Sequence, residues 1–109
     1  VLGRMGAEVS YIVKETAEEE KAALLKEADM VISGAGAAHI IRPEMLKDGV
    51  ILVDAGTSGS GGGVAGDMHP DCAEKATLFT PVPGGVGPIA VSCLFKNTVL
   101  LLQSRGELA

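Results

Sequence analysis

Short segments rich in β-branched residues alternate with helix-forming segments along the chain, and this alternation constrains the fold more than any other feature. The expected strands are residues Glu8–Val13, Asp29–Ser33, Val50–Asp54 and Leu78–Thr80. The expected helices are Ala17–Ala28, Pro43–Leu46, Pro70–Ala76 and Pro88–Ser104. Strands separated by single helices form right-handed βαβ units, whose strands are parallel. The sequence therefore predicts an α/β fold with a Rossmann-like parallel sheet and helices on both faces.

Local signals support several of these elements. Thr16 followed by Glu19 has the spacing of a capping box at the start of a helix. The unbroken apolar run in Val50–Asp54 is typical of a strand that is covered on both faces. Helical spacing in the last helix places six side chains on one face: Val91, Leu94, Phe95, Thr98, Leu101 and Leu102.

Composition narrows the class of protein. The 109 residues suffice for one domain, and 47% apolar with 3% aromatic residues predicts an aliphatic core. A net charge of −5 and the lack of a Lys/Arg run argue against nucleic acid as a partner. The longest apolar runs, such as Val99–Leu102, are far shorter than the ~20 residues that span a bilayer, so no membrane is expected. Cys72 and Cys93 are interpreted as reduced thiols of a cytoplasmic protein.

Small and polar residues follow each expected strand. Lys14 and Glu15 follow the first, Gly34–Gly36 the second and Asp54–Thr57 the third, and the fourth runs into Pro83–Pro88. Because ligands of parallel α/β sheets bind beyond the carboxyl ends of the strands, this pattern predicts a nucleotide-type site. Small residues at strand ends also serve plain helix packing, which is the alternative.

The segment Thr80–Pro88 contains three glycines and three prolines and opens directly into an apolar helix. Gly84, Gly85 and Gly87 carry no Cβ, so the backbone can approach a flat ring or a carboxamide. Pro88 suits the first turn of a helix, whose free amides lie at the positive end of the helix dipole. A tight loop that only reverses the chain is the other interpretation.

A dinucleotide-binding fold normally begins with a strand, a glycine-rich turn and a helix that holds the pyrophosphate. Val1–Met5 is interpreted as the end of that helix, and Gly6 and Ala7 as the turn that follows it. We therefore expect residues 1–109 to form a partial NAD(P)-binding domain that lacks its first strand.

The segment Thr80–Pro88, together with several shorter motifs, resembles the carboxyl-terminal half of the bifunctional methylenetetrahydrofolate dehydrogenase/cyclohydrolase family. The specific motif is Pro83–Pro88, which reads Pro-Gly-Gly-Val-Gly-Pro. Supporting matches run in order along essentially the whole chain: Gly6–Val9, Ala28–Ile32, Lys47–Gly49, Val53–Gly56, Val64–Asp67, and Asn97 with Thr98 in the last helix. The chain departs from the family's usual pattern in the glycine-rich loop Thr57–Gly63 and at Ala90, where a Thr is frequent.

The resemblance implies a site for each ligand. Pro83, Gly84, Gly85, Val86 and Gly87 would line the place where the folate substrate meets the nicotinamide. Gly56 and Thr57 would contact the cofactor through the main chain, and Gly34, Ala35 and Gly36 would pass beneath the ribose and pyrophosphate. Lys14 would lie near the adenine ribose. Lys14 and its neighbour Glu15 favour opposite cofactors, so the expected cofactor is NADP with NAD as the alternative.

The implied reaction is hydride transfer from methylenetetrahydrofolate to the nicotinamide, followed by hydrolysis of the methenyl product to 10-formyltetrahydrofolate. In the family, the catalytic lysine and its tyrosine neighbour belong to an amino-terminal catalytic domain, which is absent from this chain. Tyr11 lies within an expected strand, and no lysine here matches the motif. We therefore expect no catalytic residue in this chain, no activity from the chain alone, and a homodimer as the assembly.

Other candidate chemistry is less specific. His69 lies near Asp67 and Cys72, but these three residues do not complete a metal site. The preferred interpretation of His69 is a turn cap before a helix. His39 has no acid or cysteine close by. The run Gly59–Gly63 lacks the lysine of a P-loop and is interpreted as a mobile surface loop. Ser58 and Ser60 have no base nearby. Two other functions stay open: a non-catalytic α/β oligomerisation module, and the nucleotide domain of another dehydrogenase.

Overall fold

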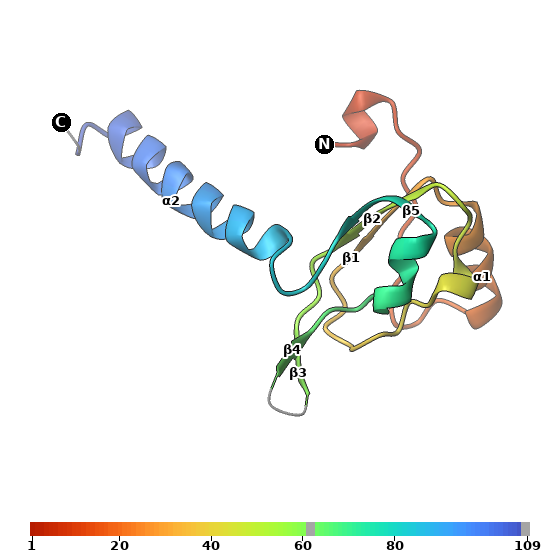
Figure 1. Cartoon of the computed structure of the whole chain (residues 1–109). Helices are drawn as coiled ribbons and strands as arrows, with labels where there is room; N and C mark the ends of the chain where they lie inside the picture. Colours follow the sequence, from red (N-terminus) through yellow and green to blue (C-terminus); the bar gives the residue numbers. More distant parts are fainter. Residues whose placement is uncertain (61–62, 108–109) are drawn as a thin grey trace.

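The computed structural model describes residues 1–60 and 63–107 and contains both helices and strands (Figure 1). The elements in order are the 3-10 helix η1 (Gly3–Met5), α1 (Glu18–Glu27), β1 (Met30–Ser33), η2 (Pro43–Met45), β2 (Val50–Asp54), β3 (Ser58–Ser60), β4 (Gly63–Ala65), η3 (Pro70–Glu74), β5 (Ala76–Thr80) and α2 (Val86–Ser104). The expected strands that begin near residues 29, 50 and 78, and the expected long helices, are therefore confirmed within a few residues at each end.

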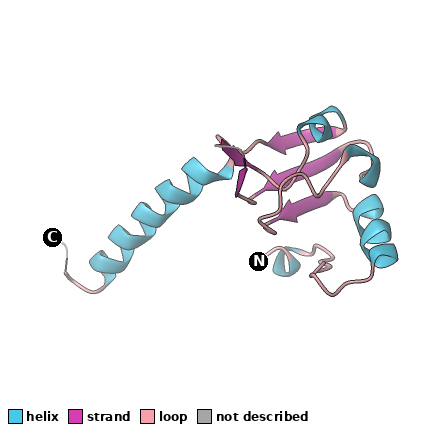
Figure 2. Ribbon diagram, turned by 90° about the horizontal axis from the view of Figure 1, so that it is seen from below, coloured by secondary structure: helices cyan, strands magenta, loops and turns pink. Residues whose placement is uncertain are grey.

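The central sheet has the order β1-β2-β5, and both pairs of strands are parallel. Ile32 is paired with Val53, and Leu52 with Phe79. Figure 2 shows the three arrows pointing the same way. The carboxyl ends of all three strands therefore meet at one edge of the sheet, as the predicted α/β fold with a Rossmann-like parallel sheet requires.

One face of this sheet carries the hydrophobic core. Its fully or nearly fully buried members are Val31, Ile41, Leu46, Val50, Leu52, Met68 and Cys72. Leu25 of α1 packs against this cluster. On the opposite face Met30, Ile32 and Leu78 are about half exposed, because side chains alternate along a strand and no described helix lies over them. The described elements therefore bury only one face of the sheet. The apolar run Val50–Asp54 predicted that both faces would be covered.

Two expectations for the first thirty residues are wrong. Glu8–Val13 forms no strand among the described residues, since an isolated extended segment needs a partner strand to satisfy its amides. Helix α1 begins at Glu18 with Ala17 as its N-cap, and no side chain caps it. The Thr16 hydroxyl accepts a hydrogen bond from the Val13 amide instead, at 3.0 Å, so it closes the preceding turn rather than a capping box.

The glycine-rich segment after β2 is not simply a loop. Strands β3 and β4 pair antiparallel, with Ser58 opposite Ala65 and Gly59 opposite Val64. Gly61 and Gly62, part of the expected surface loop, lie outside the described residues. Glycine weakens a strand, but the two short antiparallel segments satisfy each other's backbone groups, and the Ser58 hydroxyl also donates to the Ala65 carbonyl at 3.4 Å.

Helix α2 leaves the sheet and extends away from it (Figures 1 and 2). The apolar face expected from the sequence is present but is not buried: Leu94 is 65% and Phe95 70% exposed. The radius of gyration is 16.6 Å, against the ~13 Å of a compact chain of this length. By length and composition alone α2 would suffice to cross a membrane, a test that the core helices of soluble proteins also pass.

Candidate functional site

Three backbone segments come together at the carboxyl edge of the sheet. The Ala55 amide, just after β2, donates to the carbonyl of Ser33 at the end of β1, at 2.8 Å. The Asp54 amide donates to the Thr80 hydroxyl at the end of β5, at 2.9 Å. A Cβ on Gly36 would lie 3.7 Å from the carbonyl oxygen of Thr57. The loops after β1, β2 and β5 thus form one continuous surface.

The Asp67 carboxylate organises the loop after β1. It is fully buried and accepts hydrogen bonds from the Ser33 hydroxyl at 2.6 Å, the Ala35 amide at 2.6 Å and the Ala37 amide at 3.0 Å. Charge-assisted bonds of this kind are roughly twice as strong as neutral ones. The loop Gly34–Ala37 is therefore fixed by a side chain that lies thirty residues further along the chain.

The same bonds set the protonation of Asp67. Burial alone would raise the pKa of this carboxyl, because desolvation disfavours the charged form. The hydrogen bonds from Ser33, Ala35 and Ala37 stabilise the carboxylate and outweigh burial, so its pKa is lowered from the ordinary 3.8. Asp67 is therefore ionised at neutral pH, although it is enclosed by protein.

Asp54, at the end of β2, holds the segment that carries Asp67. Its side-chain oxygens accept hydrogen bonds from the amides of Gly56 at 3.0 Å, Asp67 at 3.1 Å and Met68 at 2.9 Å. The residue is 1% exposed. The two carboxylates thus form a buried network in which Asp54 fixes the backbone of Asp67, and Asp67 fixes the loop after β1.

Two glycines leave room for this network. A Cβ on Gly56 would overlap the carboxyl group of Asp67, and a Cβ on Gly66 would overlap that of Asp54. Any other residue at either position would displace a buried carboxylate from its donors. Here glycine is required by close packing rather than by an unusual backbone conformation.

The expected substrate-binding segment connects β5 to α2. Gly84 has φ +97°, a conformation that side chains rarely adopt, and the peptide bond between Val82 and Pro83 is cis. Gly85 is the N-cap of α2, and a Cβ there would overlap the carbonyl oxygen of Pro81. Apart from their chain neighbours, no atom of residues 1–60 or 63–107 outside the helix backbone lies within 4 Å of the Cβ position of Gly84 or Gly87. The segment is thus closely packed at Gly85 and open at Gly84 and Gly87.

A small cavity of about 80 Å³ lies behind this segment, lined by His39, Asp54, Gly66, Met68, Pro70, Phe79, Pro81 and Val82. Sites for drug-sized ligands are several times larger, so this cavity is too small for a dinucleotide. His39 and His69 approach each other edge to face, with ring centroids 5.1 Å apart. The Nδ1 atom of His69 accepts from the Asp71 amide at 3.1 Å, which confirms the predicted turn cap.

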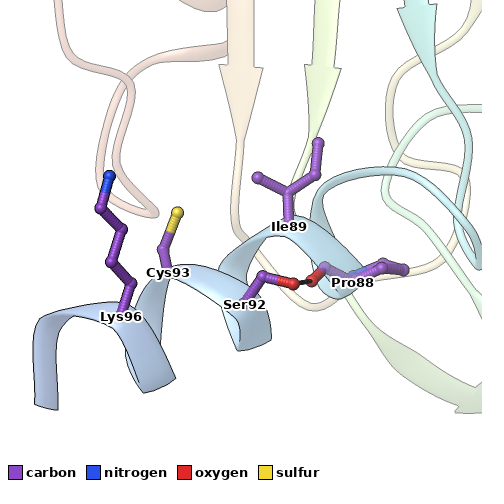
Figure 3. Close-up of a pocket in the computed structure, with 5 residues that line it drawn as sticks. All are labelled: Pro88, Ile89, Ser92, Cys93 and Lys96. Carbon is purple, nitrogen blue, oxygen red and sulfur yellow. Dashed lines mark hydrogen bonds between the residues drawn. The ribbon is translucent and has the colours of Figure 1, made fainter. Parts of the chain in front are cut away.

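A second hollow, of about 300 Å³, lies on α2 (Figure 3). Ile89, Cys93 and Lys96 line it from one side of the helix, and the Ser92 hydroxyl donates to the carbonyl of Pro88 at 3.0 Å. Its lining residues all belong to the first turns of a single helix, so it is a surface depression of α2.

The structure brings most of the predicted site residues to one edge. Gly34, Ala35 and Gly36 lie beside Gly56 and Thr57, and the segment Pro83–Gly87 follows the neighbouring strand. Lys14 is exposed in the turn before α1, and no hydrogen bond within residues 1–60 and 63–107 joins it to the others. Its role in cofactor binding stays a prediction.

Sequence reasoning missed Asp54 and Asp67 as the organising residues. The sequence places Asp54 at the end of a strand and Asp67 near His69, but it does not indicate that either carboxylate is buried. The available signal was that each acid lies within two residues of a glycine, Gly56 or Gly66, in a segment that is otherwise apolar and buried.

Comparison with known proteins agrees with this geometry. Residues 1–105 match the NAD(P)-binding domain of tetrahydrofolate dehydrogenase/cyclohydrolase. The bifunctional protein FolD of Lactobacillus gasseri is 43% identical over 83 residues, which are 75% of this chain and 29% of that protein. FolD of Aquifex aeolicus is 47% identical over 75 residues, 68% of this chain and 26% of that one. The chain thus spans less than a third of the length of these relatives.

Solved structures give the same picture. A 5,10-methylenetetrahydrofolate dehydrogenase from the silkworm Bombyx mori superposes with a TM-score of 0.88 at 32% identity, covering 94% of this chain and 35% of that one. The dehydrogenase-cyclohydrolase of Trypanosoma brucei, solved with NADP and an inhibitor, gives 0.76 at 36% identity, covering 87% and 34%. On its sequence match and its fold, the chain belongs to the tetrahydrofolate dehydrogenase/cyclohydrolase family and corresponds to its NAD(P)-binding domain.

Proposed function

We propose that this chain is the cofactor-binding part of an enzyme of one-carbon metabolism. That enzyme oxidises 5,10-methylenetetrahydrofolate to methenyltetrahydrofolate with NADP, NAD being the alternative cofactor, and hydrolyses the product to 10-formyltetrahydrofolate. The observation that carries the proposal is the meeting of three glycine-bearing segments at the carboxyl edge of a parallel sheet, in a chain of this family.

The residues at this edge fit a dinucleotide. In the described part of the chain, no non-neighbouring atom lies within 4 Å of the Cβ positions of Gly34, Gly84 and Gly87, so their backbone is open to a ligand. Gly34, Ala35, Gly36, Gly56 and Thr57 would hold the cofactor, with Lys14 beside the adenine ribose. The segment Pro83–Gly87 would position the folate. The bound nicotinamide supplies hydride acceptance, and the protein supplies orientation.

No side chain of this chain is assigned a catalytic role. The side-chain oxygens of the buried acids Asp54 and Asp67 are occupied as acceptors for backbone amides. We therefore propose that the chain alone binds cofactor but does not turn over substrate. We also place it in the cytoplasm as part of a homodimer, with no membrane or nucleic-acid partner, in keeping with its net charge of −5.

Isothermal titration of the 109-residue chain with NADP+ and NAD+ tests the proposal. Gly34→Val places a side chain on the open surface without a collision, so the fold is expected to persist while affinity for the cofactor falls. Gly59→Val is the matched control, since its Cβ position is equally free but lies in the hairpin. No binding of either cofactor by the unaltered chain would contradict the proposal, and so would equal effects of the two substitutions.

The exposed apolar side chains of α2 favour a second candidate function, a non-catalytic oligomerisation module. Leu94, Phe95 and Leu101 are each more than half exposed. Sedimentation of the chain, with and without NADP+, separates the two functions. A stable oligomer that binds no cofactor would favour the module.

A further inference from the structure

The loop after β1 turns its backbone donors inward. The amides of Ala35 and Ala37 both donate to the Asp67 carboxylate, at 2.6 and 3.0 Å. Backbone amides of one loop that converge on an anion form the kind of concavity that elsewhere binds phosphate. In this chain the concavity is already filled by a buried side chain of the protein itself.

The orientation of the amides determines what the outer surface of the loop presents. In a trans peptide the N–H and the preceding C=O point in opposite directions. The carbonyls of Gly34 and Gly36, which share peptide planes with the Ala35 and Ala37 amides, therefore point away from Asp67. Within residues 1–60 and 63–107 no hydrogen bond reaches either carbonyl oxygen. The outer surface thus presents these two carbonyl acceptors, while the Ala35 and Ala37 donors face inward.

An acceptor surface selects its ligand by chemistry. Hydroxyl and amide donors bind to carbonyl oxygens, whereas a phosphate, which offers only acceptors and negative charge, is repelled by them and by the carboxylate behind. The hydroxyls of a ribose and the carboxamide of a nicotinamide are such donors, and the pyrophosphate is not.

We propose that Asp67 is a positioning residue that makes the loop Gly34–Ala37 a binding surface for the uncharged, hydroxyl-bearing part of the cofactor and closes it to the phosphates. This inference rests on the proposed function and makes it more specific. The resemblance implies that Gly34–Gly36 passes beneath both the ribose and the pyrophosphate of the cofactor. We propose instead that this segment contacts the ribose and does not contact the pyrophosphate.

The surroundings of Asp67 support a positioning role. Its own amide donates to the Asp54 side chain at 3.1 Å, which fixes where the Asp67 side chain begins. The missing Cβ of Gly56 provides the space for the carboxyl group. A glutamate would carry its carboxyl one bond further and could not keep the same donors, so the side-chain length is specified as well as the charge.

A first experiment uses the unaltered chain and amide NMR. Titration with sodium pyrophosphate is expected to leave the Ala35, Gly36 and Ala37 resonances unchanged, and titration with NADP+ is expected to shift resonances of the same loop. A pyrophosphate-dependent shift of the Ala35 or Ala37 amide would show donors that face the ligand and would overturn the inference. This test does not depend on whether any variant folds.

A second experiment compares three variants by NADP+ affinity. Asp67→Asn replaces one acceptor oxygen with an NH2 group, which faces an amide donor of the loop, so the Kd is expected to rise about tenfold or more. Ser33→Ala removes a bond to the same carboxylate but keeps both amide bonds, and the exposed Asp71→Asn is the matched charge control. Asp71→Asn is expected to stay within about twofold of the unaltered chain, and Ser33→Ala to lie between it and Asp67→Asn.

Anion binding distinguishes positioning from general structural support. Asp67→Asn removes the internal anion, so pyrophosphate is expected to shift the Ala35 and Ala37 amides of this variant and not those of Ser33→Ala. Unchanged NADP+ affinity in a folded Asp67→Asn chain would overturn the inference alone. Absence of NADP+ binding by the unaltered chain would instead overturn the proposed function and with it the ligand named here.

Discussion

Removing the Asp54 carboxylate tests the buried network most directly. In Asp54→Ala, the amides of Gly56, Asp67 and Met68 each lose their acceptor. A buried donor left without a partner costs about 1–3 kcal/mol. The adjacent cavity of about 80 Å³, lined in part by Asp54, gives water a route to these donors, so the lower figure applies to each. The expected loss is therefore about 3 kcal/mol, a large share of the ~5–15 kcal/mol that stabilises a domain.

Urea unfolding followed by circular dichroism at pH 7 measures this loss. Asp54→Asn retains one acceptor oxygen and should lose about half as much as Asp54→Ala. Asp71→Ala, whose side chain is 67% exposed, is the control and should change the free energy of unfolding by less than about 0.5 kcal/mol. A similar slope in all variants would show that the same surface unfolds. If Asp54→Ala lost less than about 1 kcal/mol, the three amides would not depend on this carboxylate, and the reasoning would be refuted.

Three further results are expected. The folded-state pKa of Asp67 lies below the ordinary 3.8, so its contribution to stability is complete at pH 7 and is lost as the pH falls below about 4. The urea midpoint should therefore drop more steeply between pH 4.5 and pH 3 in the unaltered chain than in Asp67→Asn. Gly56→Ala, which drives a Cβ into the Asp67 carboxyl group, should cost about 2 kcal/mol or more in the same assay, whereas Gly59→Ala should cost under about 1 kcal/mol; equal losses would contradict the packing argument. Exposed Cys93 should react with a thiol reagent in the folded chain. Cys72 is buried, which raises the pKa of its thiol, so it should react only in urea. Reaction of both cysteines without denaturant would show that the core is open.

The sheet was predictable because its strands carry their own signal. Apolar runs such as Val50–Asp54 are separated by helix-forming segments, and parallel pairing then follows from the connections between them. The gathering of glycines at the carboxyl edge of the sheet followed from the same rule, since Gly34, Gly36 and Gly56 come directly after those strands. This part of the site depends on local sequence and topology only.

The errors came from interactions that local sequence does not contain. Glu8–Val13 has strand-forming residues, but a strand exists only where another strand pairs with it. The pairing of Ser58 with Ala65 in the hairpin satisfies backbone groups that a glycine-rich composition suggests are free. In both cases the partner decides the structure.

The buried acids were missed for a related reason. Asp67 contacts Ser33, which lies 34 residues earlier, and the bond forms only because the fold brings the two together. An aspartate between a glycine and a methionine is ordinary in a turn, so the residue types alone do not reveal a charge enclosed in the core. Burial and a full set of donors become visible only in three dimensions.

The open glycines at the start of α2 have a mechanical consequence. Gly84 and Gly87 lie where the chain leaves the carboxyl edge of the sheet and a helix of 19 residues begins. Such a helix is about 28 Å long, so a rotation of about 10° at its base would displace its far end by about 5 Å. A ligand that changes the backbone angles of Gly84 would therefore move Ser104 much further than it moves Gly84. The position of Ser104 would then depend on what is bound at the edge of the sheet.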